Sequence, residues 1–174
     1  LPAPLLPALS FHAPIAANTV NVNARIRRDY EACIVPAICA AGDDEQYGSS
    51  AVCDVACLQA LSKRIHYGKF VAETKFRTAR AEFTRFIKAG DRAALYAAIT
   101  DAEVEARLLL RVERKAATYG QELNLAHAAP TYKIKPRLVA ELYRDWIIPL
   151  TKDVEIEYLL IRLDAPEPEA PAAG

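Results

Sequence analysis

The stretch from about Ser50 to Phe86 constrains the fold most, because it has neither a proline nor a glycine cluster that would end a helix. It predicts one long helix, which the sequence KAGDR ends. A short helix through AALYAAI follows, and then a helix to about Tyr119, with Thr100 as its N-cap and Glu103 completing a capping box. Nowhere do apolar and polar residues alternate as in a strand. We therefore predict an all-α fold, a helical bundle with one long central helix.

The remaining segments define one domain with irregular ends. A helix is predicted through ARIRRDYEACIVPAICA, with N-caps offered by NTVNVN. The last helix should begin at Pro136, bend at Pro149 and end near Leu163. Residues 1–14 are rich in proline and alanine and predict an extended lead-in, and residues 165–174 predict a disordered tail. Residues 15–164 then form the helical domain.

Charge and hydropathy exclude two classes of partner. The chain has 174 residues, with 22 Lys plus Arg and 22 Asp plus Glu, so its formal net charge is zero. A neutral chain is not held to nucleic acid or to a membrane surface by bulk charge. No apolar run approaches the length of a membrane span. We expect no nucleic-acid partner and no membrane partner.

The four cysteines do not form a pattern typical of a metal site. Cys53 and Cys57 are spaced i, i+4, but Cys33 and Cys39 do not supply a second pair with ligand spacing, and the histidines are scattered. We expect free and mostly buried thiols, no metal site and a reducing compartment.

Two cations lie where a helix would be expected to bury apolar side chains. Arg64 and Lys75 are eleven residues apart, which is about 20° past three full turns, so they share a face about 16.5 Å apart. Gly68, Val71 and Ala72 fill the face between them. A glycine inside a helix lowers stability by about 1 kcal/mol relative to alanine. Its presence here indicates that another group approaches the helix backbone closely. The alternative is a surface helix whose cations extend into solvent.

Two polar pairs on later helices extend this pattern. Asp101 and Glu105, and then Thr151 and Glu155, are each spaced i, i+4 and so share a helical face. Each pair alone is typical of a solvated face. If these faces meet the cations inside a bundle, the buried charge is tolerable as a site for a small, anionic, hydroxylated molecule. No Ser, Cys or Lys has a convincing histidine partner, so the set favours electrostatic rather than nucleophilic catalysis.

The sequence closely resembles a known enzyme family. YGSSAVCDVACLQALSKRIHYGKFVAETKFR is similar to the central segment of the all-helical chorismate mutases of plants and fungi. NTVNVNARI, ITDAEVEARLLLRVERKAATYGQE and LVAELYRDWIIPLTKDVEIEYLLIRL resemble the segments before and after it. The resemblance covers about residues 10–164 in order, with similar spacing.

The resemblance implies a reaction, the rearrangement of chorismate to prephenate at the entry to phenylalanine and tyrosine synthesis, an outlet of the shikimate pathway. It implies no cofactor and no covalent intermediate. It also implies roles for six residues. Arg64 binds a carboxylate, Lys75 and a protonated Glu155 contact the ether oxygen, Glu105 binds the hydroxyl, and Thr151 and Asp101 line the pocket.

Two features of the family are matched only in part by this sequence. The family takes a further arginine from an N-terminal helix that the sequence does not present, so we expect the pocket to lack one carboxylate clamp and one wall. Family members bind tyrosine or tryptophan between subunits, near a Gly-Ser pair that matches Gly48 and Ser49. The resemblance implies a homodimer and gives this effector site weak support.

Two other functions stay open. The chain could be a truncated, non-catalytic derivative that binds ligand or regulates an intact subunit, or a secreted chorismate mutase that acts in a host. The compartment is also open, with the cytoplasm or a plastid favoured and secretion as the alternative. Keeping both Lys75 and a protonatable Glu155 favours the enzyme.

Overall fold

The computed structural model describes residues 14–43, 45–122 and 129–166. The sequence prediction for residues 1–13 and 167–174 lies outside these. The helical elements are, in chain order, α1 (Asn23–Asp29), the π-helical turn η1 (Tyr30–Ile34), α2 (Val35–Ile38), α3 (Tyr47–His66), α4 (Gly68–Thr78), α5 (Arg80–Ala89), α6 (Arg92–Ile99), α7 (Ala102–Tyr119), α8 (Pro136–Leu142), the π-helical turn η2 (Tyr143–Ile147) and α9 (Ile148–Leu160).

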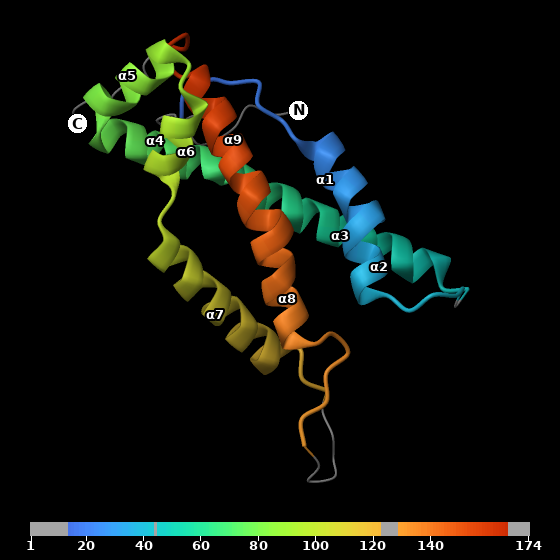
Figure 1. The fold of residues 1–174 in the computed structure, drawn as a ribbon. Helices are drawn as coiled ribbons and strands as arrows, with labels where there is room; N and C mark the ends of the chain where they lie inside the picture. Colours follow the sequence, from blue (N-terminus) through green and yellow to red (C-terminus); the bar gives the residue numbers. More distant parts are fainter. Residues whose placement is uncertain (1–13, 44, 123–128, 167–174) are drawn as a thin grey trace, which may run out of the picture.

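The helices form an open bundle around one crossing. α3 and α4 continue in nearly one direction and are crossed by α8 and α9 (Figure 1). α9 packs on α3, α4 and α6, α7 runs beside α8, and α1 packs on α3 from the other side. Among the described residues, the extended pairing is limited to one bridge between Gln121 and Tyr132. The predicted all-α fold is confirmed.

The predicted single long helix is wrong in its continuity. At Tyr67 the backbone stays near helical values (φ −62°, ψ −16°), so α4 continues α3. At Ala79 it leaves them (φ −126°, ψ 47°), and α5 turns away. The hydroxyls of Thr74 and Thr78 bond to carbonyls one turn back, a contact that often bends helices. The turn lets α5 bury Phe83 in the core.

The last predicted helix is also divided. Pro136 begins α8 as expected, but the distortion predicted at Pro149 takes the form of the π-helical turn η2, which ends two residues before that proline. Pro36 stands at the same offset after η1. A π-helical turn adjusts the hydrogen-bond ladder at the point where a proline lacks its N–H.

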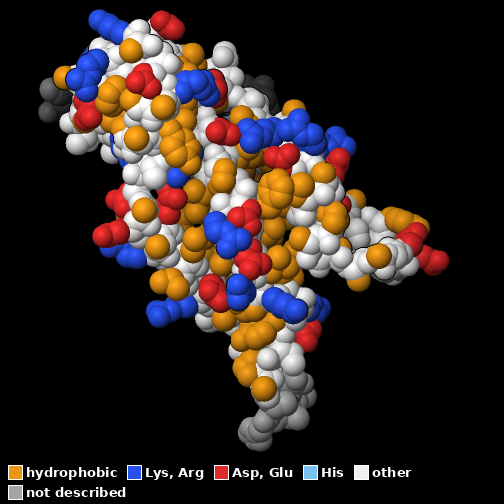
Figure 2. Space-filling view, viewed as in Figure 1, with side chains coloured by type: hydrophobic (Ala, Val, Ile, Leu, Met, Phe, Trp, Pro, Cys, Tyr) orange, Lys and Arg blue, Asp and Glu red, His pale blue; other side chains and the backbone are white. Residues whose placement is uncertain are grey.

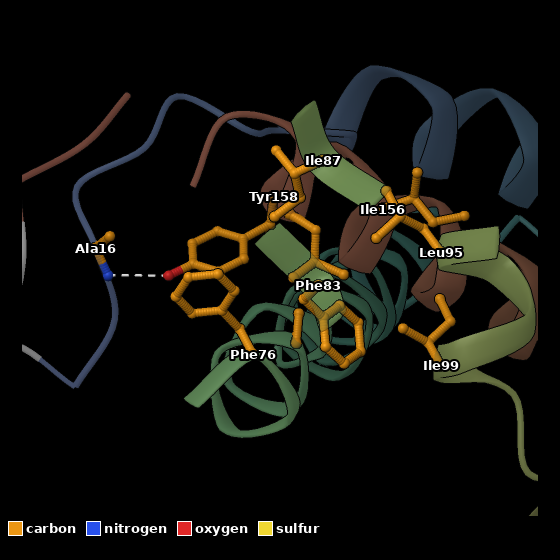
Figure 3. Close-up of a cluster of buried hydrophobic side chains, with 10 residues drawn as sticks. Ala16, Phe76, Phe83, Ile87, Leu95, Ile99, Ile156 and Tyr158 are labelled. Carbon is orange, nitrogen blue, oxygen red and sulfur yellow. Dashed lines mark hydrogen bonds between the residues drawn. The ribbon is translucent and has the colours of Figure 1, made fainter. Parts of the chain in front are cut away.

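The larger core joins α4, α5, α6 and α9 around fully buried side chains such as Phe76, Leu95 and Leu159. Figure 3 shows Tyr158 from α9 beside Phe76, with its hydroxyl toward the N-terminal segment. That hydroxyl accepts a hydrogen bond of 3.0 Å from the backbone N–H of Ala16. The segment before α1 is therefore tied to the core.

A buried ion-pair network lies under this core. Glu73 of α4 accepts hydrogen bonds of 2.6 Å from Arg162, Tyr158 and Arg77. Arg162 and Glu73 are 1% and 2% exposed. Burial alone would raise the pKa of Glu73, but these hydrogen bonds outweigh it, and the pKa lies below its usual value. The network joins α4 to the end of α9.

The surface agrees with a neutral chain. Figure 2 shows Lys and Arg side chains intermixed with Asp and Glu over the face in view. In the described residues, no helix is both long and apolar enough to cross a bilayer. The cysteines are free, but the expectation of burial is wrong, since Cys39 and Cys53 are exposed and Cys33 and Cys57 are partly so.

Candidate active site

All six residues predicted for the site line one cavity. It has a volume of about 290 Å³ and lies between α3, α4, α7 and α9, with the end of α6 beside it. The predicted residues that line it are Arg64, Lys75, Asp101, Glu105, Thr151 and Glu155. The polar residues of the three predicted helices therefore line the same cavity. The alternative of separate solvated faces is wrong for this set.

The two cations enter the cavity from the last turns of α3 and α4. The Arg64 guanidinium carbon lies 6.0 Å from the centroid of the Tyr143 ring of η2. The Lys75 ammonium donates a hydrogen bond to the carbonyl of Ile99, in the last turn of α6. A helix C-terminus carries partial negative charge, so this contact holds the ammonium beside the cavity without neutralising it.

Glu155 on α9 is the most perturbed group in the cavity. It is 7% exposed, and its Oε2 atom is buried without a hydrogen-bond partner among the described residues. Burial raises the pKa of this carboxyl from its ordinary 4.5 to about 7. Three cations oppose the rise, in order of effect Lys75, Lys152 and Arg64. A carboxyl that is protonated near neutral pH can donate a hydrogen bond to a ligand.

Asp101 has a structural role besides its place in the wall. It is the N-cap of α7, and its Oδ1 accepts a hydrogen bond of 3.0 Å from the backbone N–H of Val104. The prediction that Thr100 caps this helix is wrong, because Thr100 is extended and its hydroxyl bonds to the Tyr96 carbonyl. Asp101 keeps one carboxylate oxygen outside this hydrogen bond.

Thr151 contributes less hydrogen-bonding capacity than its place in the pattern implies. Its hydroxyl donates a bond of 2.6 Å to the carbonyl of Ile147 in η2, one turn back. The residue lines the cavity, and its backbone carbonyl lies against Gly68. The side chain is therefore fixed before any ligand arrives.

The close approach predicted at Gly68 is confirmed, and the neighbour is α9. A Cβ at Gly68 would lie 2.9 Å from the Thr151 carbonyl oxygen and 3.0 Å from the Glu155 Cγ. Ala72 is buried on the same side, whereas Val71 is 46% exposed and lines the cavity. The glycine thus serves helix packing next to the site.

The sequence interpretation missed Lys152. Its ammonium lies 2.6 Å from Oε1 of Glu105, and the residue lines the same cavity at 7% exposure. The predicted pairs have the i, i+4 spacing, which does not include Lys152. Lys152 precedes Glu155 by three residues, a spacing that also places side chains on one helical face. That signal could have found it.

Gly48 and Ser49 do not belong to this cavity. They lie in the first turn of α3 and are exposed, and the Ser49 hydroxyl bonds to the Gln46 carbonyl. The described residues contain no cluster of three His, Cys, Asp or Glu side chains that could hold a metal ion. The chemistry available in the cavity is that of cations, carboxyls and a hydroxyl.

The fold is an all-α bundle with a polar cavity between its helices, and the comparisons with known proteins name its family. The model of the family "Chorismate mutase type II" matches residues 46–156. The chain belongs to this family.

Named relatives agree with this assignment. Chorismate mutase 1, chloroplastic, of Petunia hybrida is 49% identical over 170 residues, which are 94% of this chain and 52% of that protein. The chorismate mutase Aro7p of Candida albicans, solved in complex with L-Trp, matches with a TM-score of 0.83 at 41% identity and covers 96% of this chain and 64% of that one. AtCM1, solved with tyrosine in an allosteric site, matches with a TM-score of 0.81 at 49% identity, with coverage of 94% and 65%. The chain spans about half the length of the Petunia relative.

Proposed function

We propose that this chain carries the active site of a chorismate mutase, which rearranges chorismate to prephenate in the synthesis of aromatic amino acids. The reaction is an isomerisation. The ether C–O bond breaks as a new C–C bond forms, and no atom is gained or lost. The observation that carries the proposal is the buried carboxyl of Glu155, which has a free Oε2 and a pKa near 7 in a cavity that also presents Arg64 and Lys75.

The two cations bind and orient the substrate in this proposal. Chorismate is a dianion, and Arg64 offers a planar fork that suits a carboxylate. Lys75 supplies a compact charge at the other end of the same wall. Together they hold the substrate in the folded shape in which its reacting carbons meet, which removes much of the entropic barrier.

The rate enhancement comes from groups that face the ether oxygen. Negative charge develops on this oxygen as its bond to carbon lengthens. Lys75 and the protonated Glu155 donate hydrogen bonds to it, and they are held in position before the substrate binds, so little reorganisation is needed during the reaction. An ionised Glu155 would instead repel the developing charge, so the protonated form is the active one.

The remaining wall recognises the substrate hydroxyl. Glu105 accepts its hydrogen bond, and Asp101 and Thr151 complete the lining. A site that pairs a substrate hydroxyl discriminates strongly against an analogue that lacks this hydroxyl, because the carboxylate is then left unpaired. Proton NMR of chorismate incubated with the chain tests the proposal. Prephenate signals that grow as those of chorismate fall support it, and unchanged chorismate contradicts it.

Regulation and assembly form a second proposal. We infer that the chain pairs as a homodimer and that aromatic amino acids bind near Gly48 and Ser49. Tyr47, Val52 and Val55 at the start of α3 are 67%, 70% and 55% exposed, an apolar surface that a second copy would cover. Two related structures hold tyrosine or L-Trp. Sedimentation with and without tyrosine tests both points, and a monomer that is indifferent to tyrosine contradicts them.

A further inference from the structure

Lys152 is a third cation of the cavity, and its environment is unusual for a lysine. Its side chain is 9% exposed, and its ammonium lies 2.6 Å from Glu105 and 4.8 Å from the centroid of the Tyr96 ring. Burial opposes its charge, but the bond to Glu105 and the nearby Tyr96 outweigh this effect, so the pKa of Lys152 is raised. The lysine is therefore firmly charged at neutral pH.

The charges of the cavity explain why a third cation matters. Glu105 and Asp101 are carboxylates in the same wall as Arg64 and Lys75. Without Lys152, these two cations would face two carboxylates, and the site would offer no net attraction to a dianion. An ion pair between Lys152 and Glu105 neutralises one of the carboxylates. Arg64 and Lys75 then remain available to bind the ligand.

We propose that Lys152 is a positioning residue, which holds the Glu105 carboxylate in place in the cavity wall so that Arg64 and Lys75 remain available to a dianionic substrate. The proposal rests on the function proposed above. The contact joins α9 to α7, whose packing is otherwise mainly on α8. Lys152 thus fixes the wall that recognises the hydroxyl relative to the wall that carries Glu155.

The same lysine acts on Glu155 through space. The charged groups that face Glu155 come from each packed helix: Arg64 of α3, Lys75 of α4, Glu105 of α7 and Lys152 of α9 itself. Lys152 lowers the pKa of Glu155, and its charge is the second largest effect of this kind. Loss of that charge should therefore move the Glu155 titration to higher pH. Loss of a lysine charge outside the cavity would not produce this change.

The test uses the full chain labelled with ¹³C at the glutamate carboxyl carbons. The Glu155 signal is assigned by its loss in Glu155→Gln, and its pKa is then compared between wild type, Lys152→Gln and Lys88→Gln. Lys88 is exposed on α5 and gives the matched change of charge. We expect an upward shift in Lys152→Gln, a return toward wild type in Lys152→Arg, and none in Lys88→Gln. Equal titrations in Lys152→Gln and Lys88→Gln overturn the proposal, with or without turnover.

Kinetics supply a second readout where the wild-type chain turns over chorismate. Lys152→Gln should raise KM about 10- to 100-fold, the worth of a hydrogen bond to a charged group. Because Lys152 acts through Glu105, the double variant with Glu105→Gln should be no worse than Glu105→Gln alone. An unchanged KM in Lys152→Gln, or fully additive effects, overturns the proposal while the proposed reaction stands. A wild-type chain without turnover contradicts the reaction, and the NMR titration still decides the role of Lys152.

Discussion

Gly68 lies so close to Thr151 that no side chain fits between them. A Cβ at Gly68 would stand 2.9 Å from the Thr151 carbonyl oxygen, nearer than such atoms approach. It would also stand 3.0 Å from the Cγ of Glu155. The contact between α4 and α9 therefore sets the position of two site residues. A glycine that weakens a helix by about 1 kcal/mol is explained by this requirement.

Gly68→Ala should impair both the site and the fold. The methyl group must push α9 away from α4, because the nearest atom belongs to backbone and cannot rotate aside. We expect a loss of about 1–3 kcal/mol of stability and a lower kcat, since Glu155 moves with α9. Thermal melting and steady-state kinetics measure the two effects. Gly48→Ala is the control for melting, because a Cβ there meets no atom within 4 Å. A Gly68→Ala protein with wild-type melting would contradict the account.

Turnover should fall as pH rises through about 7. Glu155 has its pKa raised to about 7 by burial, and only its protonated form donates to the ether oxygen. Below that pH the carboxyl is neutral and active, and above it the carboxylate repels the developing charge. In Glu155→Gln the amide donates at every pH, so the fall should disappear. Rate profiles from pH 5 to 9 would show it, and an identical fall in Glu155→Gln would assign the titration to another group.

The same carboxyl should make stability depend on pH. The unfolded chain ionises Glu155 near pH 4.5 and the folded chain only near 7, so the folded state binds more protons between these values. The contribution of this group to stability therefore falls by roughly 3 kcal/mol as pH rises from 4.5 to 7 and is flat beyond. Glu155→Gln should be more stable than wild type at pH 8. Urea titrations at pH 5 and pH 8 measure the difference, and a less stable variant at pH 8 would refute it.

The buried pair of Glu73 and Arg162 should matter far more than a surface pair of the same length. Both pairs have an N–O distance of 2.6 Å, but Arg92 and Glu157 are about half exposed. Arg162→Met leaves a buried carboxylate without its main partner and should cost about 3–5 kcal/mol. Arg92→Met should cost less than about 1 kcal/mol. Urea unfolding compares the two, and similar costs would mean that the buried network is dispensable.

The sequence predicted the all-α fold class and much of the candidate site. Helical spacing placed Arg64 and Lys75 on one face and paired Asp101 with Glu105, and the cavity contains all four. Such spacing depends only on the local helix geometry, so it holds in the folded protein. It does not say which faces meet, and the resemblance to a family supplied that step.

The failures occurred where tertiary packing outweighed local signals. Ala79 has high helix propensity, yet the chain turns there because α5 then buries Phe83. Thr100 was a reasonable cap on local grounds, but Asp101 takes that place at the cavity edge. Lys152 was missed because its value depends on Glu105, which lies on another helix.

The most direct test of the central claim is the loss of chorismate ultraviolet absorbance in the presence of the chain, with Lys75→Ala beside it. Lys88→Ala on exposed α5 controls for the loss of a lysine. The account predicts turnover by wild type and Lys88→Ala, and a drop of at least about 100-fold in Lys75→Ala with its helical circular dichroism unchanged. Equal turnover in Lys75→Ala and wild type would contradict the claim that this cavity performs the rearrangement.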